Sequence, residues 1–140
     1  MTKFKLFLIA LVVLIFLPLY IWVIEPTYQR YQIAGQAEAY FNEIPQYPGA
    51  IPVEKWLSFS FIGYGYRYSS NDDPDKIISF YTSQLTNNWQ LLNKSGSWNS
   101  KDLQFKKEGD IYKLTISVSK LNNQPLTSPP YDLTVFVYKP

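Results

Sequence analysis

One short helix is predicted by the spacing of apolar residues in DDPDKIISFYTSQLTNNWQ, residues 72–90. Its apolar stripe recurs at spacings of one, three and four positions and consists of Ile77, Ile78, Tyr81 and Leu85. Asp73 is a suitable N-cap, because its carboxylate accepts bonds from the first free backbone amides. Pro74 then takes the first helical position, where its missing N–H is no loss. A stripe of this kind needs a partner surface, which the rest of the chain must supply.

The end of this helix is predicted at Asn88, because asparagine tolerates the left-handed conformation that often terminates a helix. Such a reversal directs the next side chain, that of Trp89, back over the last turn. We therefore expect Trp89 to be buried against the helix stripe and the sheet beneath it.

Extended structure rich in aromatic residues is predicted before the helix, from Trp56 to Ser69. Its apolar side chains occupy odd positions first and even positions afterwards: Leu57, Phe59, Phe61, Tyr64, Tyr66 and Tyr68. A strand exchanges its two faces only through an extra residue or a turn. We therefore expect a bulge or a break near Ile62 and Gly63.

Alternating residues after the helix predict a β-hairpin within residues 103–120, with its turn at EGD, residues 108–110. A last strand is predicted over residues 131–138, and an additional short strand from Gln90 to Asn93. Packing the helix stripe on one face of the resulting antiparallel sheet gives a two-layer α+β domain.

An unbroken apolar run from Leu6 to Ile24 lies near the N-terminus. As a helix it spans roughly 28 Å at about 1.5 Å per residue, close to the hydrocarbon core of about 30 Å. We therefore predict a transmembrane signal-anchor over residues 1–25, with the lipid bilayer as the partner of residues 6–24. The alternative is a cleaved signal peptide, whose apolar region is shorter and whose cleavage site follows closely. The nearest small-residue triplet, residues 37–39, lies too far downstream for that alternative.

The charges that flank the apolar run predict its orientation. Lys3 and Lys5 precede it, whereas Glu25 and then Arg30 follow it. Positive residues favour the cytoplasmic side of a membrane helix. The expected localisation is the cell membrane, with a single pass, a cytoplasmic N-terminus and an extracytoplasmic C-terminal domain.

Three parts are predicted along the chain. The anchor, residues 1–25, is followed by a helical stalk over residues 26–45. The apolar residues that fall near one face of this stalk are Tyr31, Ala34, Ala37, Phe41 and Ile44. IPQYPGAIP, residues 44–52, has the prolines and glycine of a turn or linker. The extracytoplasmic α+β domain is therefore expected over residues 46–140.

Composition restricts the chemistry that the chain can carry. No cysteine or histidine occurs among the 140 residues, which excludes disulfides, Ser-His-Asp triads and Cys-His pairs. The net charge of +2 gives no argument for a nucleic-acid partner. Asp72, Asp73 and Asp75 are hard oxygen donors, yet helix capping explains them better than a calcium loop does. We expect no cofactor and no metal.

A wider sequence pattern connects these segments. YPGA at residues 47–50 is followed by an aromatic strand and then by DP…IISFYTSQL…NW at residues 73–89. This pattern resembles that of small membrane-anchored or secreted bacterial domains of unknown function, in which the helix usually ends in GW. Asn88 stands here at the glycine position, a substitution that the left-handed conformation permits. The resemblance, over residues 44–138, implies a fold and a location but no activity.

Three functions are compatible with these features. The first, which we expect, is a membrane-anchored extracytoplasmic interaction or structural module without catalytic activity, binding an unknown extracytoplasmic protein. The second is a small-ligand or glycan-binding domain that uses exposed tyrosines, with Tyr64, Tyr66 and Tyr68 as its surface. The third is a carboxylate-based hydrolase, although the spacing indicates no carboxylate pair. Whether the tyrosine side of the first strand is covered separates the first function from the second.

Overall fold

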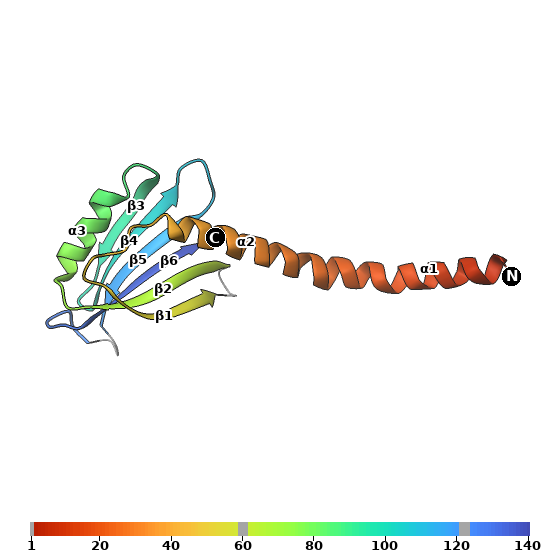
Figure 1. Cartoon of the computed structure of the whole chain (residues 1–140), viewed down its shortest axis with the longest axis horizontal. Coiled ribbons are helices and arrows are strands. Elements are labelled where there is room, and N and C mark those ends of the chain that lie inside the picture. Colours follow the sequence, from red (N-terminus) through yellow and green to blue (C-terminus); the bar gives the residue numbers. More distant parts are fainter. Residues whose placement is uncertain (1, 59–61, 121–123) are drawn as a thin grey trace. The chain divides into compact units, whose positions relative to one another are not determined.

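The computed structural model describes residues 2–58, 62–120 and 124–140 (Figure 1). Its helical elements are α1 (Thr2–Leu19), the π-helical η1 (Tyr20–Ile24), α2 (Glu25–Asn42) and α3 (Pro74–Gln84). Its strands are β1 (Ile51–Ser58), β2 (Gly63–Ser70), β3 (Trp89–Gly96), β4 (Ser100–Lys107), β5 (Lys113–Ser119) and β6 (Tyr131–Tyr138). The chain forms two compact units, Met1–Ile33 and Ala34–Pro140, and the division falls within α2.

The first unit is helical, and its π-helical turn lies between two prolines, Pro18 and Pro26. A proline has no N–H to donate, and its ring crowds the carbonyl four residues earlier. A locally widened turn before Pro26 is a physical response to both effects. The Thr27 hydroxyl donates to the carbonyl oxygen of Val23 at 2.6 Å and so satisfies a backbone acceptor in this turn.

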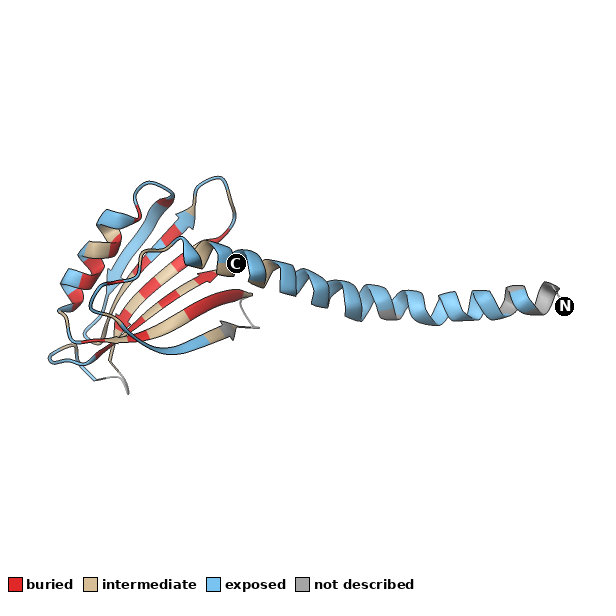
Figure 2. Cartoon of the chain, in the orientation of Figure 1, coloured by how far each residue is buried: buried red, intermediate tan, exposed pale blue. Residues whose placement is uncertain are grey.

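The second unit is built on an antiparallel sheet, which within the described residues has six strands in the order β1-β2-β6-β5-β4-β3. α3 lies against β4 and β5. Buried residues alternate with more exposed ones along β4, β5 and β6 (Figure 2). The expected α+β fold is therefore confirmed: a long apolar N-terminal helix precedes an antiparallel sheet with one amphipathic helix.

One face of the sheet, called the inner face here, carries the core. Its buried side chains are Tyr64, Tyr68, Leu103, Phe105, Leu114, Ile116, Val118, Leu133, Val135 and Val137. The stripe predicted for α3 is confirmed, since Ile77, Ile78, Tyr81 and Leu85 are all buried. Full burial of one aliphatic side chain stabilises a fold by about 1.5–3 kcal/mol. This stripe is therefore sufficient to hold α3 on the sheet.

The predicted start of α3 is confirmed. The carboxylate of Asp73 accepts a hydrogen bond from the backbone N–H of Asp75 at 2.7 Å, and Pro74 occupies the first turn. The backbone N–H of Lys76 donates to the carbonyl oxygen of Asp73 at 3.0 Å. The acidic and proline residues before the stripe therefore specify where the helix begins.

The predicted end of α3 is wrong. The helix ends at Gln84 with Leu85 as its C-cap, and Asn88 lies in the turn before β3. Threonine and asparagine at positions 86–88 are poor helix formers, so the chain leaves the helix one turn early. The backbone N–H of Trp89 donates to the carbonyl oxygen of Leu85 at 3.1 Å and closes the turn. Trp89 itself is buried, as predicted.

The extended segment predicted from Trp56 to Ser69 is two strands, β1 and β2. Ser58 pairs with Gly63, so the strands on either side of the predicted break are antiparallel neighbours. β1 already begins at Ile51, and β1 contains Pro52, which an edge strand tolerates because one row of its N–H groups has no ladder partner. Phe59 and Phe61 lie outside the described residues. β3 is also longer than expected and runs from Trp89 to Gly96.

The end of α2 packs on the inner face with aromatic side chains. The ring centre of Phe41 lies 5.0 Å from that of Tyr64 and 5.8 Å from that of Tyr66, while Ala37 is completely buried. Ala37 and Phe41 belong to the apolar face predicted for the second helix. Residues 34–42, which we expected in a stalk, therefore lie in the same compact unit as the sheet.

Tyr40 is a second aromatic contact of the α2 end. Its ring centre lies 5.2 Å from that of Tyr112 and 6.3 Å from that of Trp89, and its hydroxyl donates to the Asp110 carboxylate. The ammonium of Lys107 lies 4.9 Å from the Tyr40 ring centre and 5.1 Å from that of Trp89. Cation–π contacts of this kind strengthen as they are desolvated, and the Lys107 side chain is only 13% exposed.

Two further ion pairs join the α2 end to the sheet. Lys107 pairs with Glu43, and Lys55 pairs with Glu38 at 3.4 Å. An exposed pair such as Lys55–Glu38 contributes only about 0–1 kcal/mol.

The face of the sheet opposite to the inner face, called the outer face here, carries a row of aromatic rings. Gly63 and Gly65 of β2 leave room for these rings. Trp56 stacks on Phe136 with ring centres 4.6 Å apart and planes inclined by 6°. A Cβ added at Gly65 would lie 2.7 Å from Cδ2 of Phe136 and 2.8 Å from the carbonyl oxygen of Val135. Glycine is therefore required at position 65 by close approach.

Gly65→Ala is expected to destabilise the fold by about 1–3 kcal/mol, because the stacked rings must shift to admit the methyl group. The matched control is Gly35→Ala on α2, where an added Cβ meets nothing within 4 Å. Alanine is the better helix former, so this control should be neutral or stabilising by up to about 1 kcal/mol. Urea unfolding of the full chain in detergent, followed by near-UV circular dichroism, measures both. Equal effects of the two variants would contradict the close-approach argument.

Trp89→Ala is expected to lower the free energy of unfolding by about 3–5 kcal/mol, because it removes a buried ring and its contacts with Tyr40 and Lys107. Trp98→Ala is the control, since Trp98 is 64% exposed and surface substitutions usually change stability by about 0.5 kcal/mol or less. Thermal melts of the full-length variants give the comparison. A melting temperature of Trp89→Ala equal to that of Trp98→Ala would show that Trp89 does not belong to the core.

Candidate functional site

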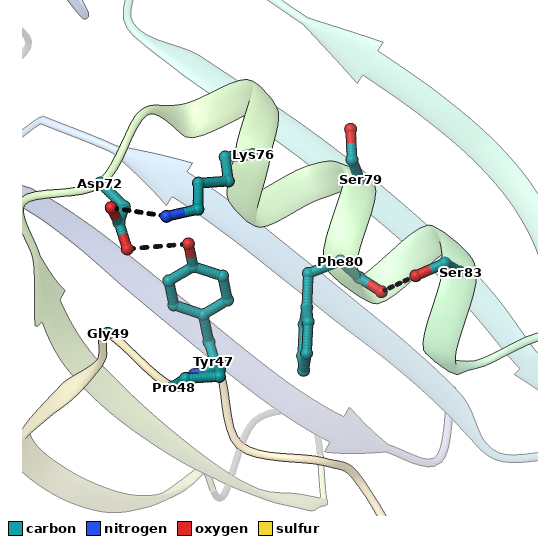
Figure 3. A pocket seen from close by; sticks show the side chains of 8 residues that line it. All are labelled: Tyr47, Pro48, Gly49, Asp72, Lys76, Ser79, Phe80 and Ser83. Atoms are coloured by element: carbon teal, nitrogen blue, oxygen red, sulfur yellow. Dashed lines mark hydrogen bonds and ion pairs between the residues drawn. The ribbon is translucent and has the colours of Figure 1, made fainter.

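A hollow of about 500 Å³ lies between the loop that precedes β1 and the outward side of α3 (Figure 3). Its lining residues are Tyr47, Pro48, Gly49, Asp72, Lys76, Ser79, Phe80 and Ser83. Its volume lies within the range of ligand sites, which is about 300–1,000 Å³. It is called the α3 hollow below.

The carboxylate of Asp72 is the polar centre of the α3 hollow. The Tyr47 hydroxyl donates to its Oδ2 at 2.8 Å, and the Lys76 ammonium donates to its Oδ1 at 3.0 Å (Figure 3). Tyr47 is buried, whereas Lys76 is exposed. Both carboxylate oxygens therefore have a donor from the protein itself.

Protonation in the α3 hollow follows from these contacts. The Lys76 ammonium, followed by the Tyr47 hydroxyl, holds the pKa of the Asp72 carboxyl below its ordinary value. Burial, followed by the hydrogen bond to Asp72, raises the pKa of Tyr47. The bond to Asp72 also raises the pKa of Lys76. At neutral pH the hollow therefore holds a carboxylate, an ammonium and a neutral phenol.

Phe80 supplies an aromatic wall of the α3 hollow. Its ring centre lies 5.3 Å from that of Tyr47 in an edge-to-face arrangement, and its ring projects from α3 beside Tyr47 (Figure 3). The Ser83 hydroxyl donates to the carbonyl oxygen of Phe80 at 2.8 Å. Ser79 is exposed on the same side of the helix. The hollow thus combines one apolar wall with hydroxyl and charged groups.

Gly49 allows the two halves of the YPGA…DP pattern to meet. A Cβ at this position would lie 2.5 Å from Oδ2 of Asp72 and 3.2 Å from Cε1 of Tyr47. The backbone N–H of Ala50 donates to the carbonyl oxygen of Tyr47 at 3.0 Å and closes the turn. The pattern therefore describes a structural connection between the loop before β1 and the start of α3.

The α3 hollow offers no carboxyl group suited to act as a general acid. Carboxyl groups that serve as general acids in glycosidases have a raised pKa, whereas that of Asp72 is lowered. Among the described residues, no three Asp, Glu, His or Cys side chains form a group that could hold a metal ion. Asp73 caps α3, and Asp75 pairs with Lys101 at 2.5 Å.

The tyrosines expected as an exposed surface lie on the inner face. Tyr64 is 4% exposed and Tyr68 is 8% exposed, and Tyr66 is partly covered. Strand register explains this, since the three residues pair with the inner-face residues Val137, Leu133 and Val135. Burial also raises the pKa of Tyr64 and of Tyr68. The structure brings the three rings together but does not present them as an exposed tyrosine surface.

Phe41 covers part of this tyrosine cluster, a contact that the sequence-based prediction did not include. It packs on Tyr64 and Tyr66 from α2, and the Lys55 ammonium lies 4.8 Å from the Tyr64 ring centre. The apolar face predicted for the second helix includes Phe41, so the signal was present in the sequence. The sequence does not indicate that this face of α2 packs on β2.

The comparisons with known proteins give one match. A family model described as START domain-like matches residues 63–128, slightly less than half of the chain, from the start of β2 to the loop before β6. No curated protein and no solved structure matches the chain. The chain is therefore similar to the START domain-like family over its central part, which includes α3 and most of the sheet.

Lys76→Met is expected to raise the pKa of Asp72 more than Tyr47→Phe does, because the ammonium is the stronger cause of the lowering. Lys106→Met, an exposed lysine of β4, should leave this pKa unchanged. Carboxyl carbon NMR titration measures the three values. A larger shift in Tyr47→Phe than in Lys76→Met would contradict the assignment.

The lowered pKa of Asp72 also determines how this residue affects the stability of the fold as the pH changes. Its folded-state pKa lies below the ordinary value of 3.8, so its contribution is present above that pH. The contribution is lost as the pH falls through the folded-state pKa, and Lys76→Met should reduce this acid-dependent loss.

Proposed function

We propose that the protein is a membrane-anchored, extracytoplasmic interaction or structural module without catalytic activity. The observation that carries the proposal is the apolar helix, whose candidate membrane span, Leu8–Asn42, has a most apolar window with a mean hydropathy of 2.6. None of that window is buried inside the structure. A core helix of a soluble domain buries its apolar side chains, so an exposed run of this length favours a lipid environment.

A cleaved signal sequence is the competing explanation for an apolar N-terminal helix. The small-residue triplet at residues 37–39 lies inside α2, and Ala37 is completely buried against the domain. Cleavage after this triplet would remove a packed residue and separate Tyr40 and Phe41 from their helix. The packing of the α2 end therefore supports an anchor that stays attached.

The proposed orientation rests on the flanking charges. Lys3 and Lys5 precede the apolar run, and the following flank begins with Glu25. The positive-inside preference then assigns the N-terminus to the cytoplasm and the sheet domain to the other side. Residues 6–24 would contact the bilayer.

The free edge of β3 supports an interaction role. In the described residues β3 pairs only with β4, so its other side has unpaired backbone groups. Leu91 and Leu92 on this strand are 41% and 46% exposed, and Trp98 in the following turn is 64% exposed. An edge with exposed apolar side chains is a surface to which a strand of a partner protein can add.

Cysteine labelling tests the orientation, because the native chain has no cysteine. Gln104→Cys, an exposed position on β4, should react with a membrane-impermeant maleimide in intact spheroplasts. Thr2→Cys should react only after lysis. Labelling of Thr2→Cys alone in intact spheroplasts would reverse the orientation.

The mass of the mature protein tests whether the anchor is retained. We expect the membrane-extracted protein to keep residues 1–25, since the α2 end belongs to the fold. A mature N-terminus near Tyr40 would show instead that the apolar segment is a cleaved signal. Labelling and mass are read out separately, so each part of the proposal fails or stands by itself.

A further inference from the structure

We propose that a second hollow, on the outer face of the sheet, binds a neutral sugar unit of a glycan chain. This hollow has a volume of about 370 Å³ and is lined by Glu54, Trp56, Arg67 and Thr134. It is called the outer hollow below. The inference goes beyond the proposed anchoring role and does not depend on which side of a membrane the domain occupies.

Strand register assembles the outer hollow from three neighbouring strands. Glu54 of β1 pairs with Arg67 of β2, and Arg67 pairs with Thr134 of β6, so the three side chains form one row across the sheet. Trp56 lies two residues further along β1, on the same face. Both α3 and the end of α2 pack on the inner face, so within the unit Ala34–Pro140 no described helix covers this row.

The hydrogen-bonding groups of the outer hollow suit a polyhydroxylated ligand. Arg67 forms an ion pair with Glu54, with its Nη2 3.1 Å from Oε2, while its buried Nε has no hydrogen-bond partner among the described residues. Buried donors without an acceptor are uncommon in proteins and need an explanation. The guanidinium donates, the Glu54 carboxylate accepts and the Thr134 hydroxyl does both. Adjacent hydroxyls of a sugar also donate and accept, so they match this set.

Charge argues that the ligand is neutral. The positive charge of Arg67 is balanced by Glu54 at salt-bridge distance, which leaves little net attraction for an anion. A purely apolar ligand would remove water from this ion pair without supplying hydrogen bonds, which is unfavourable. A neutral ligand with many hydroxyl groups needs no net charge in the hollow and supplies hydrogen bonds to the ion pair.

The aromatic side of the outer hollow consists of stacked rings. Trp56 stacks on Phe136 at 4.6 Å, and Phe136 stacks on Tyr138 with ring centres 5.5 Å apart and planes inclined by 10°. The close approach at Gly65 holds this stack over the sheet. Ligand sites combine an apolar or aromatic wall with a few placed polar groups, and a pyranose ring presents apolar C–H groups as well as hydroxyls.

The outer face continues beyond the hollow with short polar side chains. Positions that alternate with the buried residues of β5 and β6 include Thr115, Ser117, Ser119 and Asp132. The Ser117 hydroxyl donates to Oδ1 of Asp102 at 2.5 Å. Hydroxyl and carboxylate groups in successive rows can contact neighbouring sugar units, so a chain fits this face better than a single monosaccharide does.

Binding of neutral oligosaccharides to the full chain tests the inference. The probes are cellotriose, maltotriose and triacetylchitotriose, measured by calorimetry in a detergent that has no sugar headgroup. We expect at least one probe to bind when titrated to about 10 mM. Thr134→Val and Arg67→Lys should each weaken that probe roughly tenfold, because each loses a hydrogen bond in the hollow.

The matched control is Thr115→Val, the same change on the same face in β5, and it should alter binding by no more than about twofold. Thermal melts identify any variant that has lost its fold, and Arg67→Lys provides the second variant in that event. Absence of binding by all three probes would overturn the inference. So would binding that Thr134→Val and Arg67→Lys leave unchanged, or displacement of the sugar by inorganic phosphate, which would indicate an anion site.

Discussion

The width of the sheet is the constraint on which the rest of this structure depends. The six described strands, spaced by about 4.8 Å, span roughly 24 Å, whereas one helix with its side chains is only about 10–12 Å wide. α3 lies against β4 and β5 and covers that part of the inner face. Phe41 of α2 covers the tyrosines of β2, and Tyr40 covers Trp89 and Tyr112. Two helices are therefore needed to close the inner face of this sheet, and the second belongs to the segment that follows the apolar run.

Local signals in the sequence predicted the elements that local forces determine. The cap at Asp73, the stripe of α3 and the alternation of β4 to β6 each depend on neighbouring residues, and each is confirmed. The misplaced helix end at Asn88 has a tertiary cause besides the poor helix formers at positions 86–88. Leu85 enters the core, and the chain turns there to begin β3 at Trp89. The role of Tyr40 was not predictable from helical spacing, because it lies off the apolar face and contacts residues far along the chain.

The two candidate hollows differ in how much of each the sequence indicated. The YPGA…DP pattern was visible as a motif, and the contact of Gly49 with Asp72 and Tyr47 explains why these segments occur together. The row of Glu54, Arg67 and Thr134 had no motif, because it arises only from the order in which β1, β2 and β6 pair. The exposed tyrosine surface failed as a prediction for the same reason. Alternation shows which residues of a strand share a face, but the pairing of strands and helices decides which face is covered.

Continuity between the apolar segment and the fold has a further physical consequence. The residues from Ala34 to Asn42 lie in one unit with the sheet, and they belong to the same helix as residues 25–33. A helix is extended one hydrogen bond at a time once its first turn exists, so packing of Phe41 and Tyr40 on the sheet also stabilises the turns that precede them. A boundary placed at the proline-rich segment 44–52 would cut between the sheet and the side chains that close it. The physical boundary of the domain therefore lies inside α2, before the buried Ala37, and the predicted stalk and the predicted domain share one packed core.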